Sequence, residues 1–133
     1  MFFNTTALAR RLDREWTEAF APFGMTPSQA FMLRAVLEKP GMAQSQLAEE
    51  MSIARPTATR ALDGLERLGL IERQPGLTDR REIAVQPTQK GRALRTSLDE
   101  ASGTVTKRLK RQLGEDAFVA TVLKIKSIRS ALG

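Results

Sequence analysis

Cysteine, histidine and tyrosine are absent from the 133 residues of this chain. Without cysteine there are no disulfides, thiolate zinc sites, iron–sulfur clusters, or catalytic and peroxide-sensing thiols. Without histidine the commonest general base and the commonest metal ligand are missing. We therefore expect neither a cofactor nor a metal site, and most familiar hydrolase and metalloenzyme arrangements are excluded.

Long apolar runs are missing too, and we expect no secretory leader. No stretch reaches the roughly 18 apolar residues of a membrane helix, and Arg10 and Arg11 interrupt an N-terminal segment that lacks a basic start. We expect a soluble, cytoplasmic protein with no membrane partner. The length indicates one compact domain. Basic side chains outnumber acidic ones by 21 to 15, and the resulting charge of +6 points toward a polyanionic partner.

Apolar residues recur at helical spacing through most of the chain. Together with the start and stop residues, this predicts helices over about 7–20, 26–38, 44–51 and 56–68, strands over 70–74 and 82–86, one long helix over 88–113, and a last helix after residue 114. Ile71 is expected to pair with Ile83 and Val85 across the hairpin. The predicted fold class is mainly α with a small β-hairpin, in the order α-α-α-α-β-β-α-α.

The two terminal helical regions carry wide apolar stripes that include Leu8, Leu12, Phe118, Val122 and Ile125. Such stripes can pack within one subunit or between two. Stripes of this length at both ends offer more apolar surface than one subunit can cover. We therefore favour a helical dimer interface.

Two short helices joined by a tight turn and followed by a hairpin predict a winged helix-turn-helix. The second helix of such a unit fits the major groove of duplex DNA. Arg55 and Arg60 can meet guanine edges or phosphates, whereas Thr57 and Thr59 can donate hydrogen bonds or offer a methyl group to thymine. Ala58 is expected to face the core. The candidate DNA-binding residues at this helix start are Arg55, Pro56, Thr57, Thr59 and Arg60.

The hairpin loop supplies a second candidate contact through Asp79, Arg80 and Arg81. Its arginines can enter the narrow, negative minor groove. Asp79 is unfavourable near phosphate, but it makes sense as an ion-pair partner that orients one of these arginines. For Arg73 and Lys90, phosphate contact and a simple role in surface solubility remain equally open.

These segments resemble the multiple-antibiotic-resistance regulator (MarR) family of bacterial transcription factors. The specific part is the Asp-x-Arg of the wing at 79–81, followed by the Thr-x-x-Gly helix start at 88–91. The Gln-Leu-Ala at 46–48, the segment 55–73 and the Thr-Pro-Ser-Gln at 26–29 are also similar. With the flanking helices in the expected order, the resemblance covers nearly the whole chain.

The resemblance implies an obligate homodimer. Residues 1–24 and 92–133 would form a helical dimerisation region around a winged helix-turn-helix lobe at 25–91. The dimer would bind a pseudo-palindromic operator in double-stranded DNA and act as a transcriptional repressor that a small anionic or aromatic effector releases. The residues that bind an effector are not identified by the sequence. By position, the start of the recognition helix falls on 55–60 and the wing's Asp-x-Arg on Asp79 and Arg81.

Two other classes of function fit the sequence less well. A winged-helix protein-interaction module without DNA binding usually lacks a basic recognition face and a basic wing, and this chain has both. An enzyme would need a serine–lysine pair, paired acids or a bound cofactor. The chain has no Gly-rich phosphate loop and its acids are scattered, so we expect no enzymatic activity.

Overall fold

The computed structural model describes all residues from Met1 to Gly133. The N-terminal half holds α1 (Phe2–Phe20), a short 3-10 turn η1 (Ala21–Phe23), α2 (Pro27–Glu38), α3 (Gln44–Glu50) and α4 (Arg55–Arg67). A two-stranded antiparallel sheet follows, with β1 at Ile71–Pro75 and β2 at Ile83–Pro87. The chain ends in α5 (Gln89–Ala93), α6 (Arg95–Leu113) and α7 (Glu115–Leu132). The predicted fold class, mainly helical with one hairpin, is confirmed.

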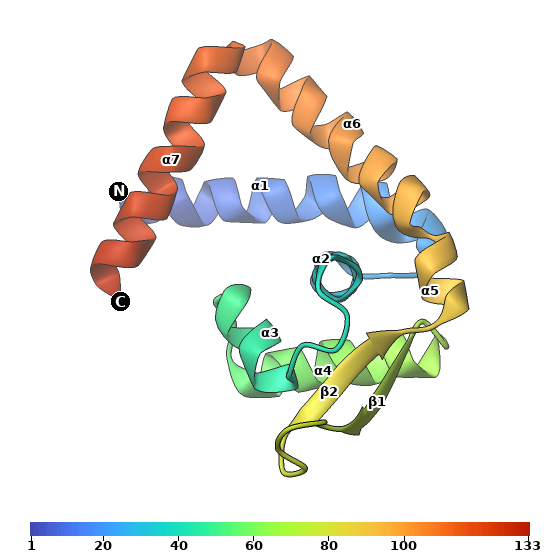
Figure 1. Ribbon diagram of the computed structural model, residues 1–133. Helices are drawn as coiled ribbons and strands as arrows, with labels where there is room; N and C mark the ends of the chain where they lie inside the picture. Colours follow the sequence, from blue (N-terminus) through green and yellow to red (C-terminus); the bar gives the residue numbers. More distant parts are fainter.

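The elements form two groups (Figure 1). Helices α2, α3 and α4 gather with the hairpin at one end, and the hairpin loop projects from that end. The long helices α1, α6 and α7 outline a triangle at the other end, where both chain termini lie. Helix α6 packs on α1 and also touches α2, so it links the two groups.

The core lies in the compact group and under its junction with α1 and α6. Its largest fully buried side chains are Phe20, Met32, Leu33, Leu47, Leu62, Leu65, Leu70, Ile71 and Leu98. Local signals fix the ends of the helices that carry them. The Thr26 hydroxyl accepts from the Gln29 amide (3.2 Å) and the Gln29 side chain accepts from the Thr26 amide (3.0 Å), which completes the capping box. Gly69 takes a left-handed φ of 73° just after α4, as its position predicts.

Three details differ from the sequence prediction. Helix α1 begins at Phe2 rather than near residue 7. In the hairpin, Ile71 lies opposite Pro87, so the expected pairing with Ile83 and Val85 is wrong. Val85 is buried with Ile71 on the core side, whereas Ile83 is 44% exposed.

The predicted single helix over 88–113 is also wrong, because it breaks at Leu94 into α5 and α6. Contacts to the turn that follows α4 hold α5 in place. The Thr88 hydroxyl donates to the Gly69 carbonyl (2.6 Å) and the Lys90 ammonium to the Leu68 carbonyl (2.8 Å). Helix α6 packs instead on α1 and α2. Both segments touch α2, but α5 is bonded to the turn after α4, whereas α6 packs on α1. Tertiary packing therefore overrides a continuous helical pattern that contains no proline at the break.

Candidate nucleic-acid interface

Helix α4 is fixed to the core by one face and leaves its opposite face exposed. Ala58, only 1% exposed, points inward with Ala61, Leu62 and Leu65, as its place in the apolar stripe predicts. Arg55, Pro56 and Arg60 are exposed. No side chain caps the helix at Ala54, and Pro56 lies in the first turn, where its fixed φ suits a helix start. The exposed start of α4 therefore presents two arginines to solvent.

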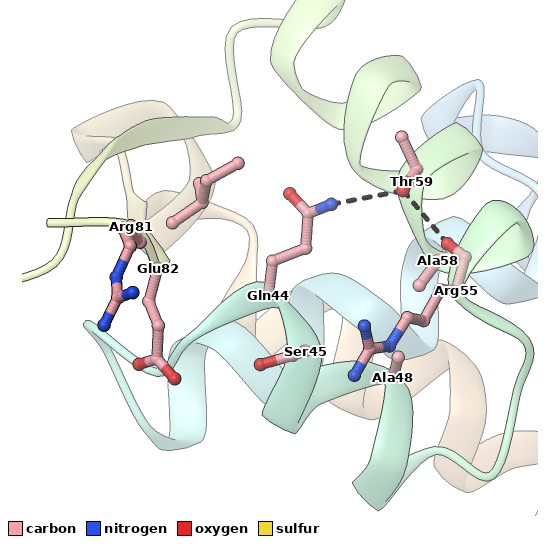
Figure 2. Close-up of a pocket in the computed structure, with 9 residues that line it drawn as sticks. Gln44, Ser45, Ala48, Arg55, Ala58, Thr59, Arg81 and Glu82 are labelled. Atoms are coloured by element: carbon pink, nitrogen blue, oxygen red, sulfur yellow. Dashed lines mark hydrogen bonds between the residues drawn. The ribbon is translucent and has the colours of Figure 1, made fainter. Parts of the chain in front are cut away.

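The two threonines at this helix start are half-buried and differ in their hydrogen bonds. Thr57 accepts a long bond from the Arg60 guanidinium (3.4 Å). Thr59 donates its hydroxyl proton to the Arg55 carbonyl (3.0 Å) and accepts from the side-chain amide of Gln44 (3.1 Å) on α3. Figure 2 shows both bonds of Thr59. The recognition helix is thus tied to the helix before it through one hydroxyl.

The loop of the wing is held by its own backbone. The Gly76 amide donates to the Glu82 carbonyl (2.8 Å) and the Glu82 amide to the Asp79 carbonyl (3.1 Å). An Asp79 carboxylate oxygen accepts from the Arg81 amide (3.0 Å) and from its guanidinium (3.4 Å). The structure therefore contains the ion pair that the sequence predicts for Asp79. The Arg81 side chain remains 93% exposed, and Arg80 is exposed beside it.

A cleft of about 400 Å³ separates the recognition helix from the wing. It brings Arg55 and Thr59 of α4 to the same opening as Arg81 of the wing (Figure 2). It is also lined by Gln44, Ser45 and Ala48 of α3, by Ala58 of α4, and by Glu82 and Ile83 on the wing side. The candidate residues on two separate segments of the sequence thus share one surface.

Arg73 is engaged inside the lobe. Its guanidinium donates to Asp63 (2.5 Å) and to Glu66 (3.2 and 3.3 Å), and its side chain is only 19% exposed. The hydrogen bonds from Arg73 hold the pKa of the Glu66 carboxyl below its ordinary value, and the bonds to Glu66 and Asp63 raise the pKa of Arg73. This network ties β1 to α4, so a phosphate contact by Arg73 would have to compete with two carboxylates. Lys90, bonded to a backbone carbonyl, is exposed.

The predicted dimerisation residues lie on surfaces that this chain leaves partly open. Helix α7 has no buried residue. Val122 is 41% and Ile125 51% exposed, Leu8 is 46% exposed, and Leu12 and Phe118 are half-buried. Further large apolar side chains are exposed on the same two helices, among them Phe2, Phe3, Val119, Leu123 and Ile128.

Gln44 is a residue of the cleft that sequence reasoning missed. A glutamine at the first position of a helix carries no motif, and its bond to Thr59 spans 15 residues. No group of three or more His, Cys, Asp or Glu side chains is placed to hold a metal ion. None of the helices has the length and apolar character needed to cross a membrane.

Comparisons with known proteins agree with this geometry. A family model described as the MarR family matches residues 23–82. The chain is 34% identical over 85 residues to an uncharacterized HTH-type transcriptional regulator, YybA, of Bacillus subtilis (strain 168). The matched region covers 64% of this chain and 57% of that protein. It is 32% identical to the HTH-type transcriptional repressor MdtR of the same organism, over 64% of this chain and 55% of the relative. The chain thus spans just over half the length of these relatives.

Among solved structures, the transcriptional repressor CouR bound to a 23-mer DNA duplex has 29% sequence identity and a TM-score of 0.83. The match covers 97% of this chain and 92% of that one. The winged helix-turn-helix lobe and the flanking helices are therefore similar together and in the same order. The sequence of residues 23–82 is similar to the MarR family, and nearly the whole chain shares the fold of this DNA-bound repressor.

Proposed function

We propose that this chain is a sequence-specific DNA-binding transcriptional regulator that acts as a homodimer in the cytoplasm. The observation that carries the proposal is the shared surface of α4 and the wing, where Arg55, Arg60 and Arg81 are exposed and Arg81 is oriented by Asp79. An arginine held by a carboxylate of its own loop loses less side-chain entropy on entering a minor groove.

In this proposal the start of α4 enters the major groove and the wing lies in the adjacent minor groove. Arg55, Pro56, Thr57, Thr59 and Arg60 form the first contact, and Asp79, Arg80 and Arg81 form the second. Lys90, at the start of α5, is exposed and is a candidate phosphate contact in this proposal. Arg73 acts mainly by fixing β1 on α4.

Residues 25–91 form the DNA-binding lobe in this proposal, and residues 1–24 and 92–133 form the dimerisation region. The open apolar faces of α1 and α7 support the second assignment, because large apolar surfaces exposed on one chain mark an interaction site. A twofold dimer would present two lobes to a pseudo-palindromic operator.

We further propose that the regulator is a repressor and that a small anionic or aromatic molecule releases it from DNA. The repressor role is supported by the relatives MdtR and CouR, which are both described as transcriptional repressors. Release by an effector rests on the resemblance to the MarR family alone. A thermal-shift screen with aromatic acids, followed by an operator-release assay, tests it: a compound that binds and lowers operator affinity supports release, and compounds that bind without lowering it contradict release.

DNA binding is tested by selecting duplexes from a random library and measuring their affinity for Arg60→Ala and Arg81→Ala. We expect Arg60→Ala to cost about 1–3 kcal/mol through a lost base contact. Arg81→Ala should weaken binding and reduce the dependence on salt concentration. Arg111→Ala, which removes the same charge from an exposed position on α6, is the matched control and should change affinity little. Unchanged affinity for both Arg60→Ala and Arg81→Ala would refute the assignment.

A further inference from the structure

Thr59 lines the cleft on the α4 side, and its hydroxyl is already occupied. A threonine hydroxyl has one proton to donate. Thr59 gives that proton to the Arg55 carbonyl of its own helix at 3.0 Å. Its oxygen also accepts the amide of Gln44 at 3.1 Å. Thr59 therefore has no proton left for a base, whereas Thr57 only accepts a long bond from Arg60 and keeps its proton free.

Both orientations of the Gln44 amide keep the Thr59 proton within the chain. With the amide turned by 180°, Thr59 would donate to Gln44 Oε1 in place of the Arg55 carbonyl. In the orientation that the structure has, the Gln44 Oε1 atom is buried without any partner in the chain, and it is the only buried side-chain nitrogen or oxygen atom in this state. A buried acceptor without a donor costs free energy. Gln44 thus donates its Nε2 hydrogen bond to Thr59 while its Oε1 atom remains without a donor.

Because the Thr59 hydroxyl is bonded within the chain, its methyl group is the part that remains available to contact DNA. Two hydrogen bonds to different helices hold the side chain in one rotamer, as Figure 2 shows. With the proton committed, the group that remains for base recognition is the methyl group, and threonine methyls make apolar contacts with the C5-methyl of thymine in the major groove. We infer that Thr59 reads a thymine methyl group in each operator half-site and that Gln44 is the positioning residue that locks it.

This inference rests on the proposed function and assigns different readout to the two threonines of the recognition helix. Thr59 makes an apolar contact, and Thr57, with its free proton, is the hydrogen-bond donor. A thymine and a uracil differ only in the C5-methyl group, so deoxyuridine is the probe that separates a methyl contact from a hydrogen bond.

The experiment replaces each thymine of a selected operator by deoxyuridine, one position at a time, and measures affinity for the wild type and three variants. For the wild type we expect one position per half-site where uracil weakens binding about fourfold (~0.8 kcal/mol), the worth of one buried methyl group. Thr59→Ser keeps the hydroxyl bonds and should lose this penalty. Thr59→Val keeps the methyl group and should retain it.

The third variant, Gln44→Met, removes the bond to Thr59 together with the unpartnered oxygen. We expect its melting temperature to be no lower than that of the wild type. The uracil penalty should shrink in part, because Thr59 keeps only its bond to the Arg55 carbonyl and its second helical rotamer becomes more accessible. The valine of Thr59→Val keeps the penalty without either bond because valine has a single preferred rotamer in a helix. A merely structural glutamine would show the opposite result, with lower stability and an unchanged penalty. Thr104→Ser is the matched control, since Thr104 on α6 makes the same bond to the carbonyl four residues before it and is exposed.

Two outcomes overturn the inference while leaving the proposed function intact. In the first, Thr59→Ser leaves the uracil penalty unchanged at every position of an operator that the wild type binds. In the second, Thr59→Val loses the base preference and Thr59→Ser retains it, which would mean that the hydroxyl reads the base. Failure of the wild-type protein to enrich any duplex would refute the proposed function and this inference together.

Discussion

Gly91 in α5 packs directly on the backbone of Leu70, at the junction between the recognition helix and the C-terminal helices. The glycine is buried, and a Cβ atom at this position would overlap the Leu70 carbonyl oxygen and crowd its carbonyl carbon at 3.2 Å. Backbone atoms cannot rotate away as a flexible side chain can. Gly91→Ala must therefore push α5 away from the turn that joins α4 to β1.

The expected cost follows from three contributions. Forcing an extra carbon into a packed site costs about 1–3 kcal/mol. The same carbonyl accepts the Thr88 amide at 3.0 Å, and disrupting that bond costs about 1 kcal/mol. The greater helix propensity of alanine returns roughly 1 kcal/mol. We expect Gly91→Ala to lower the free energy of unfolding by about 1–3 kcal/mol. For a chain of this length, each kcal/mol lowers the melting temperature by roughly 4 °C.

Gly103 in α6 provides the matched control. It is also a helical glycine, but no heavy atom outside its own helix lies within 4 Å of where a Cβ would be. Gly103→Ala should therefore stabilise the protein by about 1 kcal/mol. Thermal unfolding followed by circular dichroism, at one fixed protein concentration because the proposed dimer makes melting concentration-dependent, compares the two variants. The reasoning is refuted if both substitutions change the melting temperature in the same direction.

Three further predictions concern the dimer interface, a helix cap and an ion pair. Ile125→Glu buries a charge in the proposed interface and should shift the protein from dimer to monomer in light scattering, whereas the exposed Lys124→Glu should not; a dimer that persists in Ile125→Glu would place the interface elsewhere. Thr26→Ala removes the capping box of α2 and should cost about 1 kcal/mol in urea unfolding, and an unchanged midpoint would contradict that role. The lowered pKa of Glu66 means that its pairing with Arg73 stabilises the fold above the unfolded-state pKa of a glutamate and is lost as the pH falls through the lower folded-state pKa. The wild type should therefore be more stable than Glu66→Gln at pH 7, and the difference should disappear in acid; a constant difference down to low pH would rule out the ion pair as its cause.

Features set by neighbours in the sequence could be predicted from it. The capping box at Thr26, the left-handed Gly69 and the inward-facing Ala58 all depend on the spacing of residues within one helix or turn. The ion pair between Asp79 and Arg81 joins residues only two positions apart, so it too is visible in the sequence.

Features set by packing could not be predicted in this way. The break at Leu94 has no local signal, because it arises where α5 is held by the turn after α4 and α6 by other helices. The hairpin register depends on which strand residues face the core, and several pairings of Ile71 fit the alternating pattern equally well. Arg73 finds its carboxylates only once β1 lies against α4, and Gln44 finds Thr59 only once α3 lies against it.

The central claim, that α4 and the wing read duplex DNA as a twofold pair, is tested most directly by footprinting the wild-type protein on a duplex selected from a random library. We predict two protected half-sites related by approximate twofold symmetry and centred about one helical turn apart, roughly 10 base pairs, with affinity that falls steeply as salt rises. Failure to enrich any duplex at moderate salt would contradict the claim and favour a winged-helix module that binds protein. A single unpaired protected site would contradict the twofold arrangement.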